Sequence, residues 1–323
     1  MSVLENAVGN LTDTWRGIGE ATAVATNPGP AFETLALAVG GIAVRVDAVG
    51  GNIDDVAVAE VESGEDPQSQ WAAQGFGDAL ASVFVGGRWT LTCDTRPHAH
   101  IGLGGACPSA AAGALAANSI LTRLGRAPSL DGLCGVVAEV ERRAHGLARP
   151  GAARAALVGG MGATTRLHPP RAVSLRPPRF WMVCVAPEVD VTQLDHKSVS
   201  MGQIHVMKHV RQSARSQGLL LALQASDAHG ARDCFEDALI EPTLGKLIPG
   251  VYPALHAARE AGAIGAWVSG GGPVTCALAS EEEAATEIRD AIVHAYLAHR
   301  IESNATIARL APTRHTLHGW PHG

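Results

Sequence analysis

The sequence predicts an α+β fold divided into two domains. Stretches with strand-like alternation and stretches with helical periodicity are mixed along the chain, without the regular strand–helix alternation of a doubly wound parallel sheet. The chain has 323 residues, whereas a domain commonly contains about 100–200. The proline pairs at 169–170 and 177–178 indicate a linker. We therefore expect one domain over residues 1–175 and a second over residues 176–323.

The N-terminal half is expected to contain strands, helices and polar loops in turn. Its first twenty residues suggest a short helical or frayed extension. Strand-like alternation flanks the turn Asn27-Pro28-Gly29-Pro30, and the segment 52–70 begins like a strand and ends in a polar surface loop. The predicted strands are 20–24, 35–47 and 88–95, and the predicted helices are 71–85, 109–124 and 130–145.

The C-terminal half shows the same mixture. We expect strands at 180–186, 266–268 and 274–279, and helices at 202–224, 228–240, 252–261 and 281–297. The tail beyond residue 312 carries His315, His318 and His322. Their scattered spacing favours exposed side chains over a metal site, although a metal role stays open.

Composition and charge exclude several classes of function. Lys and Arg total 25 against 31 Asp and Glu, a net charge of −6, and aromatic residues make up 4% of the chain. This balance argues against nucleic-acid binding, which needs a concentrated basic surface. No apolar run approaches the ~20 residues of a membrane span, and the start of the chain lacks the order of a signal peptide. Six cysteines without metal-ligand spacing suggest free thiols, so we expect a cytoplasmic protein.

The strongest local signal for chemistry is IGLGGACPSAAAGALAAN, residues 101–118. A glycine-rich loop follows a predicted strand and opens into an Ala-rich helix, so backbone N–H groups and the positive end of the helix dipole can meet at one anion. The spacing matches neither a Walker A loop nor the GxGxxG pattern. An ordinary tight strand-to-helix turn is the alternative, and the loop alone does not decide between the two.

Two further segments deserve comparison with this loop. AWVSGGGPVTCALAS, residues 266–280, places three glycines between two short strands, which by itself favours a tight hairpin. TNPGPAFETLALAV, residues 26–39, places Glu33 just before an apolar strand, where a carboxylate is ordinarily a solvated turn residue.

Taken in order, these segments resemble the GHMP family of small-molecule kinases, and within it the homoserine kinases. Residues 25–39 match a SANLGPGFDTLGLAL-type segment, and GLGGACPS at 102–109 resembles the GLGSSAAS phosphate loop. The EPxxxxLIPG segment and the SGxGP turn are present at 241–250 and 269–273. The resemblance implies a ribosomal-protein-like N-terminal domain that binds ATP, a ferredoxin-like C-terminal domain, and an active site between them.

The resemblance also implies roles for single residues. The phosphates of ATP would bind to Gly102, Leu103, Gly104, Gly105, Ala106 and Ser109, and the second domain would close the site with Gly270, Gly271 and Gly272. Glu141 falls where the family has a catalytic, Mg²⁺-binding glutamate, whereas without the resemblance a solvated residue paired with Arg142 or Arg143 is preferred. Asn27, the second candidate catalytic residue, and Glu33 match an Asn and an Asp near the phosphoacceptor, where a carboxylate could pair with a substrate ammonium.

Several positions depart from the family pattern. Gly105 and Ala106 replace the two serines of the phosphate loop, and Leu244 replaces the arginine of EPYR. The HxDNVAP segment is replaced by residues 149–155, in which Arg149 could supply a cation. In the STxxAR segment Thr192 is kept, while His196 replaces the arginine. We therefore expect Glu33, Arg149, Thr192 and His196 to contact a small alcohol or acid other than homoserine.

The expected activity is ATP- and Mg²⁺-dependent phosphorylation of a small hydroxyl-bearing metabolite. Neither nucleic acid nor a membrane is expected as a partner, and a homodimer stays open. HIGLG at 100–104 is also similar to the loop of β-ribofuranosylaminobenzene 5′-phosphate synthase, a GHMP-fold transferase that uses phosphoribosyl pyrophosphate. That transferase reaction and a non-catalytic member of the same fold are the alternatives.

Overall fold

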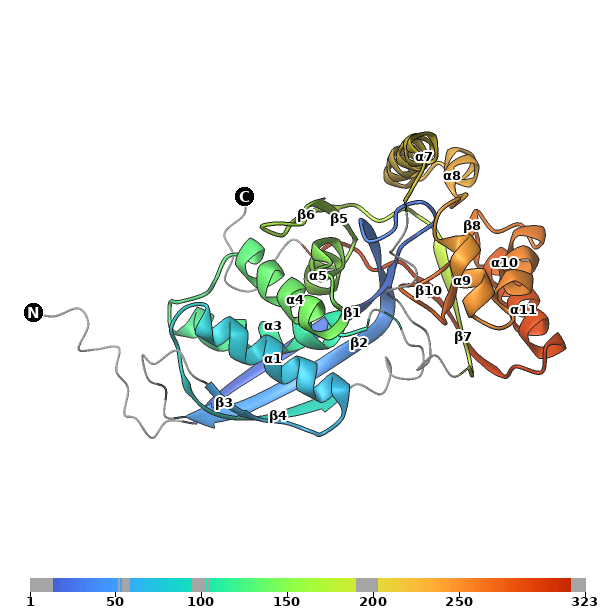
Figure 1. Cartoon of the computed structure of the whole chain (residues 1–323). Coiled ribbons are helices and arrows are strands. Elements are labelled where there is room, and N and C mark those ends of the chain that lie inside the picture. The colour runs from blue at the N-terminus through green and yellow to red at the C-terminus, as the bar shows by residue number, and fades with distance from the viewer. Residues whose placement is uncertain are drawn as a thin grey trace, which may run out of the picture.

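Two β-sheets with helices packed on them form the molecule (Figure 1). The computed structural model describes residues 14–51, 53, 59–94, 103, 105–189 and 203–314. In the first sheet the described strands have the order β3-β4-β2-β5-β6, with β1 paired to β2. In the second sheet the order is β10-β7-β9-β8. The mixed α+β architecture predicted from the sequence is confirmed.

A long antiparallel pair, β1 (Trp15–Thr26) and β2 (Leu35–Gly51), forms the centre of the first sheet. The expected strands at 20–24 and 35–47 are confirmed. The expected helical extension is wrong for residues 15–20, because Trp15 already pairs with Gly50. Gly17 and Gly19 explain this start: a Cβ on Gly19 would lie 2.0 Å from the carbonyl oxygen of Ala112, so glycine lets the strand pass directly under a helix. Residues 1–13 lie outside the described residues.

The other strands of this sheet are shorter. They are β3 (Ala59–Glu62), β4 (Gly87–Asp94), β5 (Met161–Arg166) and β6 (Arg171–Leu175). β4 matches the expected strand 88–95. The linker expected around the proline pairs 169–170 and 177–178 is wrong at the first pair, because Pro169 and Pro170 lie in the turn of the β5–β6 hairpin. The proline pair at 169–170 therefore marks a turn between two strands of one sheet. The helix and the two strands between residues 150 and 175 were not predicted from the sequence.

Four helices lie together over the first sheet (Figure 1): α1 (Pro67–Ala81), α3 (Cys107–Arg123), α4 (Leu130–His145) and α5 (Pro150–Val158). Asp66 accepts a hydrogen bond from the N–H of Ser69 and starts α1 four residues before the expected helix, so the expected loop over 52–70 ends at the helix cap. The expected helix 109–124 corresponds to α3. α4 has the expected bounds, since Ser129 caps its start and Gly146, at φ 83°, ends it.

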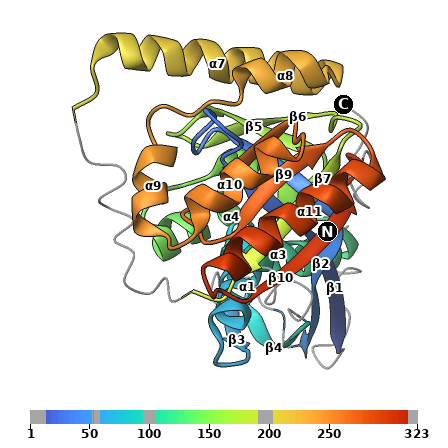
Figure 2. The same cartoon turned by 90° about the vertical axis from the view of Figure 1, so that its right-hand side faces the viewer.

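The second sheet lies between two apolar clusters, as the alternation along β7 (Trp181–Pro187) shows. Met182 and Cys184 face a cluster that contains Leu219 and Leu223 of α7 (Val206–Ala225). Val183 and Val185 face the opposite cluster, formed with α10 (Val251–Glu260) and α11 (Glu282–Ala298). Figure 2 shows α10 and α11 crossing that face, with α7 and α8 (Ala228–Cys234) along the upper edge.

The remaining strands of the second sheet are β8 (Gly265–Val268), β9 (Thr275–Ala279) and β10 (Ser303–Arg309). β10 and α9 (Glu241–Leu247) were not expected from the sequence. The expected helix 228–240 is wrong beyond Cys234, because the Asp237 carboxylate accepts bonds from three following N–H groups and turns the chain into α9. The expected helix from 202 begins at Val206, and residues 190–202 lie outside the described residues.

The change from the first sheet to the second falls between β6 and β7, close to the expected division at residue 175, which stays a prediction about folding units. After β10 the chain returns to the first sheet, where the N–H of Ala311 donates to the carbonyl oxygen of Ala38 (2.8 Å). None of the helices in the described ranges combines the length and hydropathy of a membrane span. The six cysteines are free thiols, and the three histidines of the tail lie outside the described residues.

Close packing of α1 on α3 makes Gly113 a sensitive position. A Cβ there would lie 1.9 Å from the carbonyl oxygen of Ala72. We expect Gly113→Ala to lower the free energy of unfolding by at least about 1–3 kcal/mol through overpacking, measured by urea denaturation. Gly135→Ala on α4, where nothing lies within 4 Å, is the control and should stabilise by about 0.5–1 kcal/mol. Equal effects of the two substitutions would contradict the packing argument.

Candidate active site

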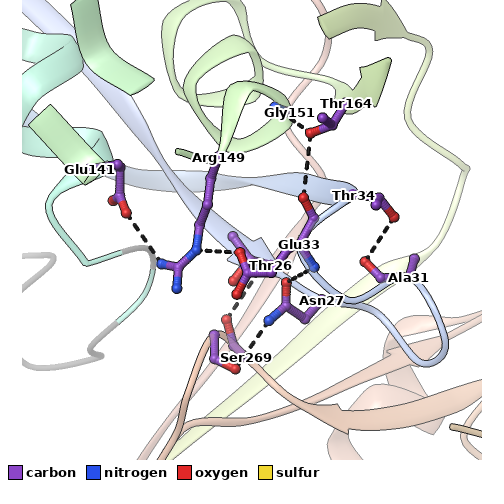
Figure 3. Close-up of polar contacts among 11 residues, drawn as sticks. Thr26, Asn27, Ala31, Glu33, Thr34, Glu141, Arg149, Gly151, Thr164 and Ser269 are labelled. Carbon is purple, nitrogen blue, oxygen red and sulfur yellow. Dashed lines mark hydrogen bonds and ion pairs between the residues drawn. The ribbon is translucent and has the colours of Figure 1, made fainter. Parts of the chain in front are cut away.

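The candidate site lies where the turn between β1 and β2 meets the turn between β8 and β9 (Figure 3). The N–H of Thr26 donates to Ser269 Oγ (3.1 Å), 243 residues away in the sequence. Trp267 Nε1 donates to the carbonyl oxygen of Thr26 (2.9 Å). Asn27 Nδ2 donates to the carbonyl oxygen of Gly270 (3.2 Å). Two of the three segments singled out in the sequence are therefore in direct contact.

Asn27 sets the shape of the first turn. Its φ is 64°, a left-handed conformation that asparagine tolerates better than most residues. Its side-chain oxygen accepts a hydrogen bond from the N–H of Glu33 (2.9 Å), and its own N–H donates to the carbonyl oxygen of Leu35 (3.1 Å). The side-chain oxygen and the main-chain N–H of Asn27 thus hold the turn, in which Glu33 has a φ of 59°.

Glu33 points to Arg149 and is not a solvated turn residue (Figure 3). Arg149 Nε donates to Glu33 Oε2 (2.5 Å), and Arg149 Nη1 donates to Glu141 Oε2 (3.2 Å). The side chains of Arg149, Glu33 and Glu141 are 17%, 10% and 0% exposed. We call these three residues the carboxylate–arginine bridge. Its members come from the N-cap of α5, the first turn and the buried face of α4.

The alternative expected for Glu141, a solvated residue paired with Arg142 or Arg143, is wrong. Arg142 pairs with Glu139, and Arg143 pairs with Asp78 on α1. Burial raises the pKa of Glu141 to about 7; the guanidinium of Arg149 opposes that shift and the carboxylate of Glu33 adds to it. The carboxyl group of Glu141 therefore changes charge near neutral pH.

The start of α3 lies next to Glu141. Gly105 has φ 58°, and a Cβ on it would lie 3.0 Å from His145 Nε2 and 3.7 Å from Glu141 Oε1. Ala106 is the N-cap and provides no side-chain hydrogen bond to the first N–H groups of α3. Among the described residues, the buried atoms Glu141 Oε1 and Ser109 Oγ have no hydrogen-bond partner. The backbone N–H of Cys107 is directed at the Glu141 carboxylate and opposes the rise of its pKa. A helix start without a side-chain cap, next to a buried carboxylate, suits an anion together with a hard cation.

The structure brings part of the expected site together. Leu103, Gly105, Ala106 and Ser109 lie at or near the start of α3, whereas Gly102 and Gly104 lie outside the described residues, as do Thr192 and His196. Gly270, Gly271 and Gly272 lie on the Asn27 side of the site, where Gly270 makes the contact already described. No group of three or more potential metal-ligating side chains occurs in the described parts of the chain, so Glu141 is a single protein carboxylate rather than part of a cage.

Sequence reasoning missed two features of the site. It did not find that Arg149 joins both carboxylates. It also missed Gln212 on α7, whose Nε2 donates to the carbonyl oxygen of Pro30 (3.2 Å) and to Asp237 Oδ1 (2.7 Å). Gln212 thus ties the first turn to the segment that leads into α9. Gln212 stands in the largely polar stretch 208–217, so the sequence carried no signal that singled it out.

Leu244 is buried and lines a small hollow that also includes Asn27, Glu241 and Gly270. A larger cavity of about 550 Å³ lies between the first turn, β5 and α7. Its described lining includes Thr34, Thr164 and Gln212. The first turn thus has a hollow on one side and a cavity on the other.

Comparison with known proteins agrees with this geometry. Residues 217–299 match the family described as GHMP kinases C terminal. The homoserine kinase of Thermococcus kodakarensis is 31% identical over 223 residues, which cover 69% of this chain and 73% of that protein. The crystal structure of homoserine kinase from Cytophaga hutchinsonii superposes with a TM-score of 0.78 at 25% identity, covering 94% of this chain and 97% of that one.

The fold and these matches define the class as that of the two-domain small-molecule kinases. Within that class, the chain belongs to the GHMP kinase family, and the matched relatives named above are homoserine kinases. Other curated relatives match over less of their length: the chain spans 65% of the homoserine kinase of Chlorobium phaeobacteroides (strain BS1) and 53% of that of Chloroherpeton thalassium, at 30% and 32% identity.

The raised pKa of Glu141 makes a prediction about stability. Between its usual pKa of 4.5 and about 7, the folded protein keeps a proton on Glu141 that the unfolded chain releases, so this residue lowers stability as the pH rises through that range. Relative to the parent protein, Glu141→Gln should gain up to about 3 kcal/mol of unfolding free energy from pH 4.5 to 8, measured by urea denaturation.

Glu139→Gln is the control for this experiment. Glu139 is exposed, and its hydrogen bond to Arg142 lowers its pKa, so its contribution to stability changes with pH in the opposite direction. Parallel pH curves for Glu141→Gln and the parent protein would show that Glu141 ionises normally.

Proposed function

We propose that this GHMP kinase transfers the γ-phosphoryl group of ATP to the hydroxyl group of a small metabolite, as homoserine kinases do, and that its preferred acceptor is not homoserine. The carboxylate–arginine bridge carries the proposal. It lies between the start of α3, which suits the phosphates of ATP, and the Asn27 turn, which suits the acceptor.

Residues at the start of α3 and on α4 support the binding of Mg·ATP. Backbone N–H groups at the start of α3 would bind phosphate oxygens, and the residues at 102–106 would bind them through the main chain, since Gly105 and Ala106 carry no hydroxyl. Glu141 would hold Mg²⁺ through its unsatisfied oxygen. When bound, the metal would neutralise charge on the phosphate oxygens. Because no cluster of metal-ligating side chains surrounds Glu141 among the described residues, the phosphates would supply further ligands.

The transfer itself needs little covalent chemistry from the protein. The acceptor oxygen forms a bond to the γ-phosphorus as the bond to the β,γ-bridging oxygen breaks, and ADP leaves with that electron pair. The proton of the acceptor hydroxyl passes to an oxygen of the transferred group and then to water. Asn27 contributes by holding Glu33 in place, since its own amide is bonded at both ends.

Charges on the acceptor side favour a substrate that differs from homoserine. Glu33 could pair with a substrate ammonium only in competition with Arg149, which already neutralises it at 2.5 Å. Leu244 offers an apolar surface to the hollow beside Asn27. Both features favour an acceptor without an ammonium group. Contacts of Thr192 and His196 with the acceptor stay predictions, as do the homodimer and the cytoplasmic location.

The test is phosphoryl transfer by the purified full chain with ATP and Mg²⁺ against hydroxy acids, polyols, amino alcohols and homoserine, followed by ADP release and product mass. We expect one hydroxyl compound without an ammonium group to be phosphorylated with a kcat/KM at least about 10-fold above that of homoserine. Homoserine as the best acceptor would contradict the acceptor assignment.

Ligand-induced changes in melting temperature separate this proposal from the alternatives. ATP with Mg²⁺ should raise the melting temperature. Phosphoribosyl pyrophosphate that stabilises the protein while ATP does not would contradict the kinase proposal in favour of a phosphoribosyl transferase. Stabilisation by neither compound, with no transfer to any acceptor, would contradict it in favour of a non-catalytic member of the fold.

A further inference from the structure

Arg149 lies between the two parts of the proposed site, the start of α3 and the Asn27 turn. Its guanidinium contacts Glu141, which lies beside the start of α3, and Glu33, which lies in the turn held by Asn27. In Figure 3 the guanidinium lies between these two groups. If ATP binds with its phosphates at the start of α3 and the acceptor binds at the Asn27 turn, the phosphoryl group moves past the Arg149 guanidinium during transfer.

The guanidinium has donors left for a ligand. An arginine carries five N–H groups. Two of them make the bonds to Glu33 and Glu141, and no described residue accepts a bond from the other three. The side chain is 17% exposed, so its free edge is reachable while most of it is held in place.

The neighbouring arginines on α4 and α5 form ion pairs with residues outside the site. Arg142 and Arg143 pair with Glu139 and Asp78. Arg154, one and a half turns along α5, donates to Asp131 (2.6 Å) and to Ser174 (2.8 Å). Of these four side chains, Arg149 is the one that faces the site.

The charges around Arg149 favour its use during the reaction. Two carboxylates share one guanidinium, so with both ionised the bridge carries a net charge of −1 and attracts a further cation. A metal ion on Glu141 would compensate that carboxylate and leave Arg149 paired with Glu33, with its remaining N–H groups, which no described residue accepts, directed to a phosphate oxygen. Gly105 and Ala106 supply no hydroxyl donor to the same region, so a side-chain donor there would come from another element.

We infer that Arg149 is a catalytic residue of the phosphoryl transfer, donating hydrogen bonds to the non-bridging oxygens of the phosphoryl group as it passes from ATP to the acceptor. This inference rests on the proposed kinase function. Glu33 and Glu141 orient the guanidinium before the substrates bind. As the bond to ADP breaks and the bond to the acceptor oxygen forms, the planar fork of N–H groups stabilises the charge on the equatorial oxygens.

The first test compares Arg149→Ala with Arg154→Ala. Arg149 is the N-cap of α5 and Arg154 lies within the helix; both side chains are 17% exposed and both pair with a carboxylate, that of Asp131 being 64% exposed, so Arg154 controls for the loss of a mostly buried arginine. We expect Arg149→Ala to lower kcat by about 10³-fold with KM for ATP changed only a few-fold, since the lost bonds form in the transition state. Arg154→Ala should keep kcat within about 2-fold, whatever its effect on melting temperature.

Two further measurements separate catalysis from structural support. Free guanidinium at non-denaturing concentration should partly restore kcat of Arg149→Ala. ADP, Mg²⁺ and aluminium fluoride, which mimic the phosphoryl group in transfer, should bind Arg149→Ala at least about 100-fold more weakly than the parent protein, while a non-hydrolysable ATP analogue binds both alike. This binding experiment is independent of turnover.

The Glu33→Gln background distinguishes a role through Glu33 from direct contact. If Arg149 acts on the phosphoryl group, Arg149→Ala lowers kcat by about 10³-fold in that background as well. A loss that disappears there would overturn the inference, because Arg149 would then only position Glu33. A kcat of Arg149→Ala within about 3-fold of the parent would also overturn it and leave the kinase proposal standing. A parent protein that transfers no phosphoryl group would overturn both.

Discussion

The buried guanidinium shared by Glu33 and Glu141 is the interaction on which the site depends. Removing three charged groups from water costs several kcal/mol per ion, so such a cluster persists only where the geometry is good and the backbone holds the partners. All three side chains are at most 17% exposed. Once formed, the bridge fixes the distance between the turn after β1, the middle of α4 and the start of α5.

Uncharged contacts hold these three elements in place. Thr164 Oγ1 on β5 accepts from the N–H of Gly151 (3.0 Å) and donates to the carbonyl oxygen of Glu33 (3.4 Å), which ties α5 to the first turn. Ser269 and Trp267 bind the backbone of Thr26 from the second sheet. The position of Glu33 is therefore determined by residues of both sheets. A site between two layers needs such cross-links, because neither layer alone orients the carboxylate.

Sequence patterns predicted the parts of this arrangement that local rules control. α4 has its expected bounds because Ser129 and Gly146 provide caps, and the alternation around the Asn27 turn identified β1 and β2. The expected linker was wrong at residues 169–170 because a proline pair occupies a hairpin turn as readily as a linker, and α5 was not predicted because a short Ala-rich run fits a helix or a loop equally well. The pairing of Arg149 with Glu33 spans 116 residues and depends on tertiary structure. Neighbours such as Arg142 do not share a helix face with Glu141, so helical geometry already disfavoured that pair.

The carboxylate–arginine bridge relates two departures from the family pattern, the missing loop serines and the arginine at position 149. In the proposed kinase, Gly105 and Ala106 in place of two loop serines would remove hydroxyls beside the phosphates, and Arg149 would add a fork of donors and a positive charge at the other edge of the same space. The same arginine pairs with Glu33, so a substrate ammonium would have to compete with it there. On this proposal a single arginine would act on both the phosphate side and the acceptor side. Because a guanidinium cannot lose its proton near neutral pH, this cation persists while the charge of Glu141 changes.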